Sequence, residues 1–215
     1  MQEERKKHWE NVYTQKQPTE VSWYQTNPGK SLELIALTGV DRSGQIIDIG
    51  GGASVLVDQL LDQGHEHLTV LDISAKAIEY AKERLKDRAE KVSWIVSDIT
   101  EFKSPVVYDL WHDGAVFHFL TEPEDRRKYV DVMSKALHAG SHVIISAFSL
   151  EGPSKCSGLD VERYDADKMA MELGDSFELV KTLDEAHITP WKAEQKFVYC
   201  YFKKSKKEIS ENERN

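Results

Sequence analysis

Short apolar segments alternate with amphipathic helical segments through most of this chain, and this alternation leaves few folds open to it. In the short segments apolar residues occupy consecutive positions, as expected for strands that are buried on both faces of a parallel sheet. The intervening segments place apolar residues three and four positions apart, which is typical of helices that cover a sheet with one face. The predicted strands span 46–49, 68–72, 92–96, 108–112 and 142–148, and the predicted helices span 53–63, 74–88, 121–137 and 165–173.

The last two predicted strands, 177–183 and 196–202, follow one another without a helix between them. A short connection joins antiparallel neighbours, so one strand at or near the edge of the sheet should run against the others. The sequence therefore predicts an α/β fold: a seven-stranded, mostly parallel sheet with helices on both faces and one antiparallel strand near the edge. We divide the chain into an N-terminal segment at 1–30, a main domain at 31–203 and a polar tail at 204–215, which we expect to be disordered.

Composition excludes several classes of protein. The chain has 215 residues, long enough for one domain with a sizeable core, and carries 28 Lys and Arg against 37 Asp and Glu. The resulting charge of −9 argues against binding to nucleic-acid backbones. No apolar run is long enough to span a membrane, and the first residues lack the apolar core of a secretory signal. Two cysteines make no disulfide framework. We expect a soluble, cytoplasmic protein without nucleic-acid or membrane partners; its oligomeric state stays open.

Polar and glycine residues follow three of the predicted strands, at the edge where the carboxyl ends of parallel strands meet. A glycine-rich turn, Asp48-Ile-Gly-Gly-Gly52, leads from the first strand toward a helix, and glycines let a ligand approach backbone N–H groups. Asp72 ends the second strand, where an acidic side chain can accept both ribose hydroxyls of a nucleotide. Asp98 follows the third strand, where it can accept from an adenine amino group while Ile99 packs on the ring. Each feature alone is common, but together they indicate a site for an adenosine-containing ligand.

Two common nucleotide-binding signatures are missing from the sequence. The dinucleotide fingerprint G-x-G-x-x-G requires a small residue at position 55, where this chain has Val55. The sequence also has no G-x-x-x-x-G-K-[ST] motif, which excludes ATP binding through a P-loop. These two absences favour an adenosine-containing ligand of another kind.

The order of these motifs resembles the class I S-adenosylmethionine-dependent methyltransferases over residues 25–202, a family with a Rossmann-like fold and an antiparallel last strand. The resemblance implies S-adenosyl-L-methionine as the cofactor. The sequences His8-Trp-Glu-Asn-Val-Tyr13 and Val21-Ser-Trp-Tyr24 also resemble methyltransferase-like proteins, some of which methylate lysines of elongation factors or other proteins. In that group the Trp-Tyr segment closes over the cofactor. The cofactor-binding residues that the resemblance implies are Trp23, Tyr24, Asp48, Gly50, Gly51, Gly52, Asp72, Ile73, Asp98, Ile99 and Asp113.

Methyl transfer from a sulfonium expels a neutral leaving group, so the main task is to hold a nucleophile in line with the methyl group. The fourth strand ends in Trp111-His-Asp-Gly114, which resembles the family's fourth motif and implies that Asp113 lies beside the sulfonium as a catalytic residue. His118, a few residues later, is the predicted general base, since a histidine pKa can lie near neutrality. The competing interpretation makes His118 a structural residue packed between its phenylalanine neighbours.

Two loops predicted at the same edge supply candidate substrate-binding residues. The loop at 151–160 is long and rich in turn residues, and it contains Cys156. The connection between the last two strands contains His187 and Trp191, which would border the substrate pocket. A purely structural role is the alternative for each of the three. A metal site built from His118, Cys156 and His187 lacks the local spacing of metal ligands, so we predict no metal.

These observations lead to three hypotheses. The first is an S-adenosylmethionine-dependent methyltransferase with a small-molecule acceptor, because the domain carries no large insertion for a macromolecular partner. The second is a protein-lysine methyltransferase, and the third is a cofactor-binding regulatory module without turnover. Oxygen, nitrogen, sulfur and carbon nucleophiles all use this fold, so the sequence leaves the acceptor undetermined.

Overall fold

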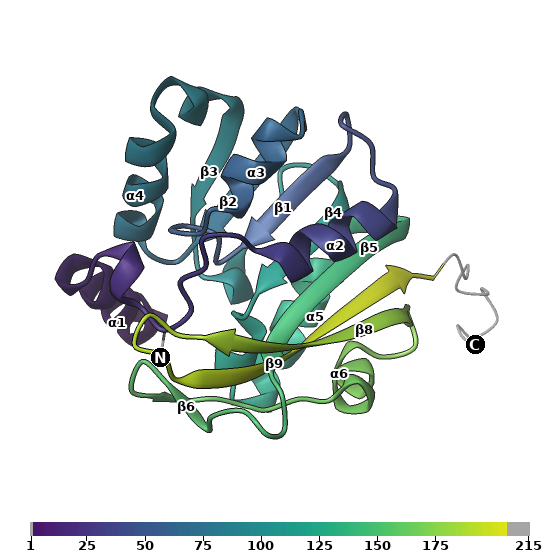
Figure 1. The fold of residues 1–215 in the computed structure, drawn as a ribbon. Coiled ribbons are helices and arrows are strands. Elements are labelled where there is room, and N and C mark those ends of the chain that lie inside the picture. The colour runs from purple at the N-terminus through teal and green to yellow at the C-terminus, as the bar shows by residue number, and fades with distance from the viewer. Residues whose placement is uncertain (1, 206–215) are drawn as a thin grey trace.

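Seven strands form one sheet in the order β3-β2-β1-β4-β5-β9-β8 in the computed structural model, which describes residues 2–205 (Figure 1). Neighbouring strands from β3 to β5 are parallel, whereas β9 runs antiparallel to both β5 and β8. The predicted sheet, with one antiparallel strand near its edge, is confirmed. The strands are β1 Gln45–Ile49, β2 His67–Asp72, β3 Val92–Val96, β4 Tyr108–Gly114, β5 Leu137–Phe148, β8 Phe177–Ile188 and β9 Glu194–Lys204; a separate hairpin pairs β6 Lys155–Cys156 with β7 Leu159–Asp160.

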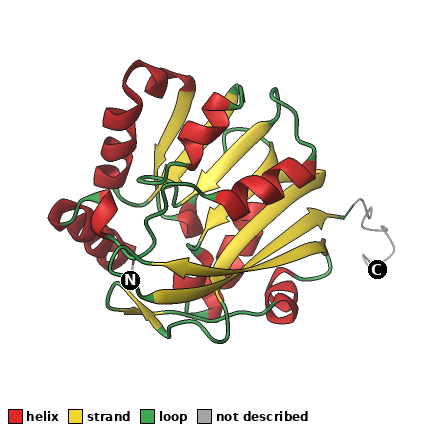
Figure 2. Ribbon diagram, viewed as in Figure 1, coloured by secondary structure: helices red, strands yellow, loops and turns green. Residues whose placement is uncertain are grey.

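Helices cover both faces of the sheet (Figure 2). Residues of α2, α3 and α4 pack into one apolar cluster, and residues of α5 and α6 pack into the other. The helix α1 contacts α4 instead of covering the middle of the sheet. The helices are α1 Gln2–Gln15, α2 Gly29–Thr38, α3 Leu56–Asp62, α4 Ala75–Leu85, α5 Pro123–Ala136 and α6 Ala166–Leu173.

The strands supply apolar residues to both clusters in turn, because successive side chains of a strand point to opposite faces. In β1, Ile47 belongs to the cluster of α5 and α6, whereas Ile46 belongs to the cluster of α2, α3 and α4. In β4, Trp111 belongs to the cluster of α5 and α6, and Leu110 belongs to the cluster of α2, α3 and α4. This two-sided burial explains why the strands have consecutive apolar residues instead of an alternating pattern.

Several elements begin or end away from the predicted positions. The helix predicted from residue 53 begins at Leu56, because Ser54 Oγ accepts a hydrogen bond from the Leu56 N–H and holds a turn before the helix. β5 begins directly after α5 at Leu137, five residues earlier than predicted (142 against 137). The last two strands are also longer than predicted, since their pairing continues to Ile188 and Glu194. Pairing partners thus extend these strands beyond their apolar runs.

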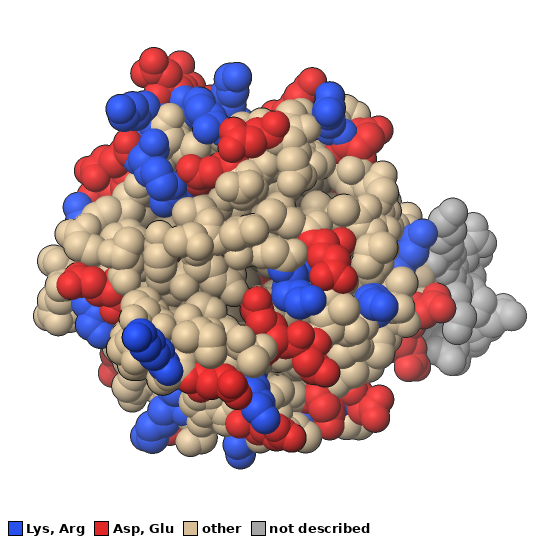
Figure 3. Space-filling model, viewed as in Figure 1, with Lys and Arg blue, Asp and Glu red and all other residues tan. Residues whose placement is uncertain are grey.

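The remaining features concern the surface and the ends of the described chain. On the face drawn in Figure 3, basic and acidic side chains are interspersed around a broad uncharged area, with no single large basic patch on that face. Within residues 2–205, no helix is long and apolar enough to cross a membrane. The tail predicted to be disordered at 204–215 lies outside the described residues from residue 206 onward.

Candidate active site

A cleft opens at the carboxyl ends of β1, β2, β3 and β4, the edge at which α/β sheets bind their ligands. The strand ends and the loops after them form its floor. Arg5, Trp9 and Tyr13 of α1 form one wall, and Cys156 lies in another part of the lining. A second pocket, called here the adjoining pocket, shares Tyr13 and Gly50 with the cleft. The site therefore combines the sheet edge with an N-terminal helix that is distant in sequence.

The glycine turn after β1 requires glycine for two separate reasons. Gly50 has φ +70°, a conformation that side chains rarely adopt, and a Cβ there would collide with Val116. A Cβ on Gly51 would collide with the Asp48 carboxylate. Gly50 also donates its N–H to the Leu71 carbonyl at 2.7 Å. The turn thus brings backbone close to both the cleft and the adjoining pocket, as the sequence predicts.

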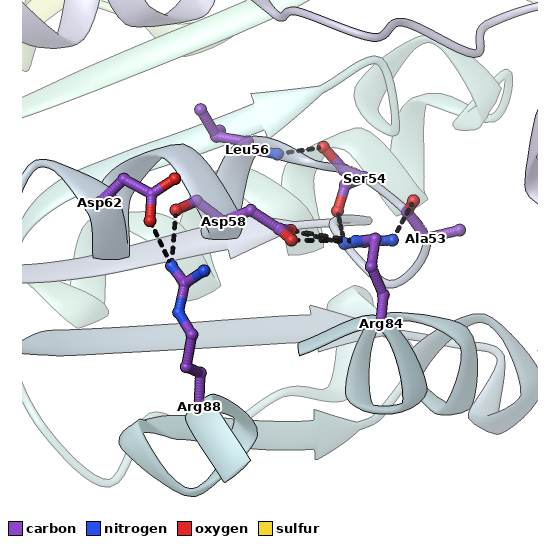
Figure 4. A network of polar contacts seen from close by, with 7 residues as sticks. All are labelled: Ala53, Ser54, Leu56, Asp58, Asp62, Arg84 and Arg88. Atoms are coloured by element: carbon purple, nitrogen blue, oxygen red, sulfur yellow. Dashed lines mark hydrogen bonds and ion pairs between the residues drawn. The ribbon is translucent and has the colours of Figure 1, made fainter. Parts of the chain in front are cut away.

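Arg84 of α4 fixes the chain that follows the glycine turn (Figure 4). Its guanidinium donates to the Ser54 carbonyl at 2.6 Å and to the Ala53 carbonyl at 3.4 Å. It also forms an ion pair with Asp58 at 2.7 Å, and Arg88 donates to the Asp58 carbonyl at 3.1 Å. Ala53 and Ser54 line the adjoining pocket, so these bonds hold part of its wall in place.

Asp72 lies in the cleft at the end of β2, where the sequence predicts it. Its carboxylate accepts from the Gly52 N–H at 3.0 Å and from the Ser74 N–H at 2.8 Å. Burial raises the pKa of Asp72 to about 6, although these two hydrogen bonds oppose the shift. Ile73, the next residue, also lines the cleft. The carboxylate retains acceptor capacity for ligand hydroxyls after both backbone bonds are made.

Asp98 and Ile99 follow β3 and line the cleft together. One Asp98 oxygen accepts from the Thr100 N–H at 2.9 Å, and the other lies 3.0 Å from the Arg5 guanidinium. Arg5 forms a second ion pair with Asp125 at 2.8 Å. Sequence reasoning missed Arg5, because a single arginine in a polar N-terminal helix carries no local signal of an ion pair with a distant aspartate.

Asp48 belongs to a buried polar chain beside the adjoining pocket. His112 Nδ1 lies 2.7 Å from one Asp48 oxygen, and His112 Nε2 lies 2.8 Å from Ser31 Oγ. All three side chains are buried and line this pocket. The second Asp48 oxygen is buried without a hydrogen-bond partner. A buried carboxylate oxygen without a partner is unfavourable, so this atom is suited to receive a donor from a ligand.

Asp113 is placed differently from its prediction. Its carboxylate is fully buried and does not line the cleft or the adjoining pocket; it accepts from the Val116 N–H at 2.6 Å, the Phe117 N–H at 3.2 Å and the Tyr129 hydroxyl at 2.5 Å. Burial raises the pKa of Asp113 to about 6. The placement beside a sulfonium is therefore wrong: side chains alternate along β4, and at position 113 the side chain points toward α5. The carboxylate anchors the loop that follows the strand.

His118 lines the cleft, but its surroundings do not suit the predicted general base. The side chain is 2% exposed, and its Nδ1 accepts from the Phe148 N–H at 3.2 Å. Burial lowers the pKa of His118 to about 3. Because Nδ1 is an acceptor, the neutral ring carries its proton on Nε2 and has no free lone pair for an incoming proton. The geometry makes His118 a hydrogen-bond donor, a correction to the predicted role.

Burial of neutral His118 makes the fold sensitive to acid. The folded pKa lies below the ordinary value of 6.5, so the stabilisation is complete above pH 6.5 and is lost as the pH falls through the range between 6.5 and 3. Between pH 7.5 and pH 5 the loss from this group is about 2 kcal/mol. We expect urea unfolding to show a free energy that declines less over this range in His118→Gln than in the wild type. Parallel pH profiles of the two proteins would contradict a buried neutral imidazole.

The three predicted substrate-binding residues are not brought together. Cys156 is buried and lines the cleft, and burial raises the pKa of its thiol to about 11. His187 is buried beside the adjoining pocket, where Nε2 donates to the Ser22 carbonyl at 2.7 Å. Trp191 is 59% exposed and lines neither pocket, so its predicted position at the pocket border is wrong. Within residues 2–205, no cluster of His, Cys, Asp and Glu is arranged to hold a metal ion.

Aromatic side chains from three segments cover the cleft. Trp9 of α1 packs edge-on against Trp23 and Phe119, with ring centroids 5.7 and 4.9 Å apart. Trp23 Nε1 donates to the Tyr13 hydroxyl at 3.3 Å. Trp23 lies in both pockets, whereas Tyr24 lines only the adjoining pocket. The part of the sequence predicted to cover a cofactor thus lies over the site, together with a 3-10 helix at Phe117–Phe119.

Comparisons with known proteins agree with this geometry. Residues 46–140 match the family model of the methyltransferase domain. Nodulation protein S of Rhizobium tropici is 27% identical over 101 residues, covering 47% of this chain and 42% of that protein. The eEF1A lysine and N-terminal methyltransferase of Mus musculus is 31% identical over 125 residues, covering 55% of this chain and 17% of that protein. The chain therefore spans less than half the length of these curated relatives.

A solved structure extends the similarity to nearly the whole chain. The 1,6-didemethyltoxoflavin-N1-methyltransferase of Burkholderia thailandensis, with bound 1,6-didemethyltoxoflavin and S-adenosylhomocysteine, has a TM-score of 0.68 at 18% identity. The match covers 91% of this chain and 81% of that chain. At this identity the similarity shows a common fold.

Proposed function

Because the chain belongs to the class I S-adenosylmethionine-dependent methyltransferases, we propose that it transfers the methyl group of this cofactor to a small-molecule acceptor by in-line displacement. The observation that carries the proposal is the cleft at the strand ends, where Asp72, Asp98 and Gly50 line one continuous site under α1. Residues at the ends of three separate strands thus contribute to one lining.

The residues present fit S-adenosylmethionine in order along the sheet edge. Asp72 would accept the ribose hydroxyls, and Asp98 with Ile99 would hold the adenine. The unpartnered oxygen of Asp48 would accept from the ammonium of the methionine part, beside the backbone of Gly50 and Gly51. A cation there would compensate the buried carboxylate, which explains why the Asp48 oxygen lacks a partner within the protein.

The cofactor supplies an activated methyl group, and the protein's contribution is to bind, orient and exclude water. Correct orientation of two reactants can lower a barrier by about 7–11 kcal/mol. Trp9, Trp23 and Phe119 would exclude water by covering the cleft, and Asp113 would keep the loop after β4 in position under it. No covalent intermediate on the protein is required.

The enclosure of the cleft supports a small acceptor over a protein segment. Its walls include α1 and the region of the β6–β7 hairpin, and its lining beyond the strand ends is mainly aromatic. The toxoflavin enzyme with this fold binds a small molecule. The similarity to the mouse lysine methyltransferase supports a protein acceptor as the second candidate. Both candidates share the cofactor and differ in the mass of the labelled product.

Thermal unfolding with added ligands tests the cofactor. A ligand at about 100 times its dissociation constant stabilises by about 2.7 kcal/mol, which shifts the melting temperature of a domain of this size by about 5–10 °C. We expect this shift with S-adenosylmethionine and S-adenosylhomocysteine, and none with NAD. The absence of a shift with either sulfur ligand at saturation would overturn the proposal.

Tritiated S-adenosylmethionine incubated with cell extract then separates the two acceptor classes. We expect the enzyme to place the label in low-mass solutes, with no labelled protein band. A labelled protein band would favour the lysine methyltransferase. Cofactor binding without any enzyme-dependent label would favour a regulatory module without turnover.

A further inference from the structure

The imidazole of His118 presents one N–H without a partner in the lining of the cleft. Its Nδ1 is occupied by the Phe148 N–H at 3.2 Å, which assigns the proton of the neutral ring to Nε2. Nε2 is buried and has no hydrogen-bond partner among the described residues. The ring packs against Phe119 and Phe148, with centroids 4.4 and 4.8 Å away. A buried donor without a partner is costly, so this N–H is suited to a ligand acceptor.

Tyr13 and Cys156, two further polar side chains of the cleft lining, are also neutral donors. The Tyr13 hydroxyl accepts from Trp23, which leaves its own proton available, and burial raises the pKa of Tyr13. Cys156 stays a thiol at neutral pH because burial raises its pKa to about 11. The remaining charged groups of the cleft are Arg5, paired with two aspartates, and Asp72 and Asp98, which under the proposed function would face the adenosine part of the cofactor.

Apart from Asp72 and Asp98, no side chain of the described cleft lining is therefore placed to remove a proton. An amine resembling the lysine side chain has a pKa of about 10.4 and must lose a proton before it attacks, and a phenol has a pKa of about 10. A thiol has a pKa of about 8.5, so a useful fraction is already ionised in neutral solution. The donors in the lining favour a nucleophile that arrives as an anion, and the positive sulfonium would compensate its charge. A carboxylate is also an anion at neutral pH, but a thiolate is the stronger nucleophile and fits better beside the aromatic rings of the lining.

Resting on the proposed function, we propose that the acceptor is a small thiol with an apolar body that reacts as its thiolate, held by the Nε2–H of His118. The thiolate sulfur forms a bond to the methyl carbon as the bond from that carbon to the cofactor sulfur breaks. The electron pair of the broken bond stays on the cofactor sulfur. An anion and a sulfonium thus become two neutral thioethers, and the protein neither takes up nor releases a proton.

Three probes with one apolar body test the acceptor class: benzyl mercaptan, benzylamine and benzyl alcohol, each assayed with S-adenosylmethionine and the wild-type protein. We expect kcat/KM for the thiol to exceed that for the amine about tenfold at pH 7.5, because the hydrogen bond from His118 to a charged thiolate is stronger than one to a neutral amine. Its pH profile should rise to an inflection at the thiol's own pKa, and a more acidic thiol, thiophenol, should move that inflection to lower pH. If the protein binds the cofactor but prefers the amine or the alcohol, or methylates none of the probes, the inference of a thiol acceptor is overturned. The proposed function is not affected by that result.

A pH inflection that stays fixed when the thiol is changed would also overturn the inference of a thiol acceptor, because that result reveals a base on the enzyme. Failure of S-adenosylmethionine to bind in the thermal experiment would instead overturn the proposed function itself. The two failures are therefore distinguishable.

Variants of His118 test its contact with the attacking sulfur. His118→Phe keeps an aromatic ring but loses the donor, so kcat/KM for the thiol should fall about 10- to 100-fold while the affinity for S-adenosylmethionine is unchanged. The pH of half-maximal kcat should rise by about one unit, because the bound thiolate loses a hydrogen bond. His118→Gln, which can accept and donate, should recover part of both effects. A fall in rate without a shift of the pH profile would mean that His118 only supports the fold.

Discussion

Replacing Asp113 by Ala is expected to lower the free energy of unfolding by about 3 kcal/mol near neutral pH. The substitution removes the acceptor of three buried donors, the N–H groups of Val116 and Phe117 and the hydroxyl of Tyr129. Each buried donor left without a partner costs about 1–3 kcal/mol, and relief of the buried charge offsets part of the sum. Urea unfolding followed by circular dichroism measures the difference. The matched control is Asp131→Ala on α5, an exposed aspartate paired with Lys135, with an expected change of at most about 0.5 kcal/mol.

The effect of Asp113→Ala should also depend on pH. The folded pKa of Asp113, about 6, lies above the ordinary value of 3.8, so this group's contribution to stability falls as the pH rises from about 4 to 6. The Ala variant lacks this decline, and the destabilisation should therefore be about 1 kcal/mol larger at pH 5 than at pH 7. Asp113→Asn, if folded, should bind S-adenosylmethionine with the wild-type affinity. A large loss of affinity in the folded Asn variant would mean that Asp113 contributes to cofactor binding.

Replacing Asp72 by Asn should weaken the binding of S-adenosylmethionine about 100-fold, as measured by isothermal titration calorimetry. The proposed ribose contacts are hydrogen bonds to a charged group, which are worth about 1.5–3 kcal/mol each, and the neutral amide replaces one acceptor oxygen by a donor. The matched control is Asp62→Asn on α3, an exposed aspartate paired with Arg88, which should leave the dissociation constant unchanged. Equal affinity of the wild type and Asp72→Asn would show that Asp72 does not bind the ribose.

The affinity of the wild type should fall about tenfold per pH unit below pH 6, because protonation of Asp72 removes the charged acceptor. In Asp72→Asn the affinity should lose this dependence. The comparison separates an effect of the Asp72 charge from a general loss of structure at low pH, since both proteins experience the same acid conditions. A profile shared by both proteins would assign the pH dependence to another group.

The strand-end residues could be predicted because their positions follow from local patterns. A buried parallel strand is read from a consecutive apolar run, and the residue after it must lie at the carboxyl edge. Asp72, Asp98 and the glycines at 50 and 51 lie at that edge for this reason, and Gly50 also needs a positive φ that the triple glycine indicates. Ile73 and Ile99 come directly after Asp72 and Asp98, so their positions at this edge are predicted together with those of the two aspartates.

The direction of the side chains in and after β4 could not be predicted in the same way. Asp113 and His112 are adjacent, and a shift of one residue would exchange the face to which each points. The structure directs Asp113 toward α5 and His112 toward Asp48. The tautomer of His118 depends on a backbone N–H thirty residues away, at Phe148. Likewise, the exposure of Trp191 depends on how far β8 and β9 continue to pair.

Local sequence patterns predict the α/β architecture, the antiparallel strand near the edge and the placement of Asp72, Asp98 and Gly50 at the strand ends, because these depend on the period of apolar residues and on glycine at a turn. The pairing of Arg5 with Asp98, the loop anchored by Asp113 and the neutral donor His118 are visible in the folded structure alone. They depend on hydrogen-bond partners and on desolvation, which arise from segments far apart in the chain. Local patterns place a residue at an edge, whereas its charge and proton depend on what the rest of the fold packs against it.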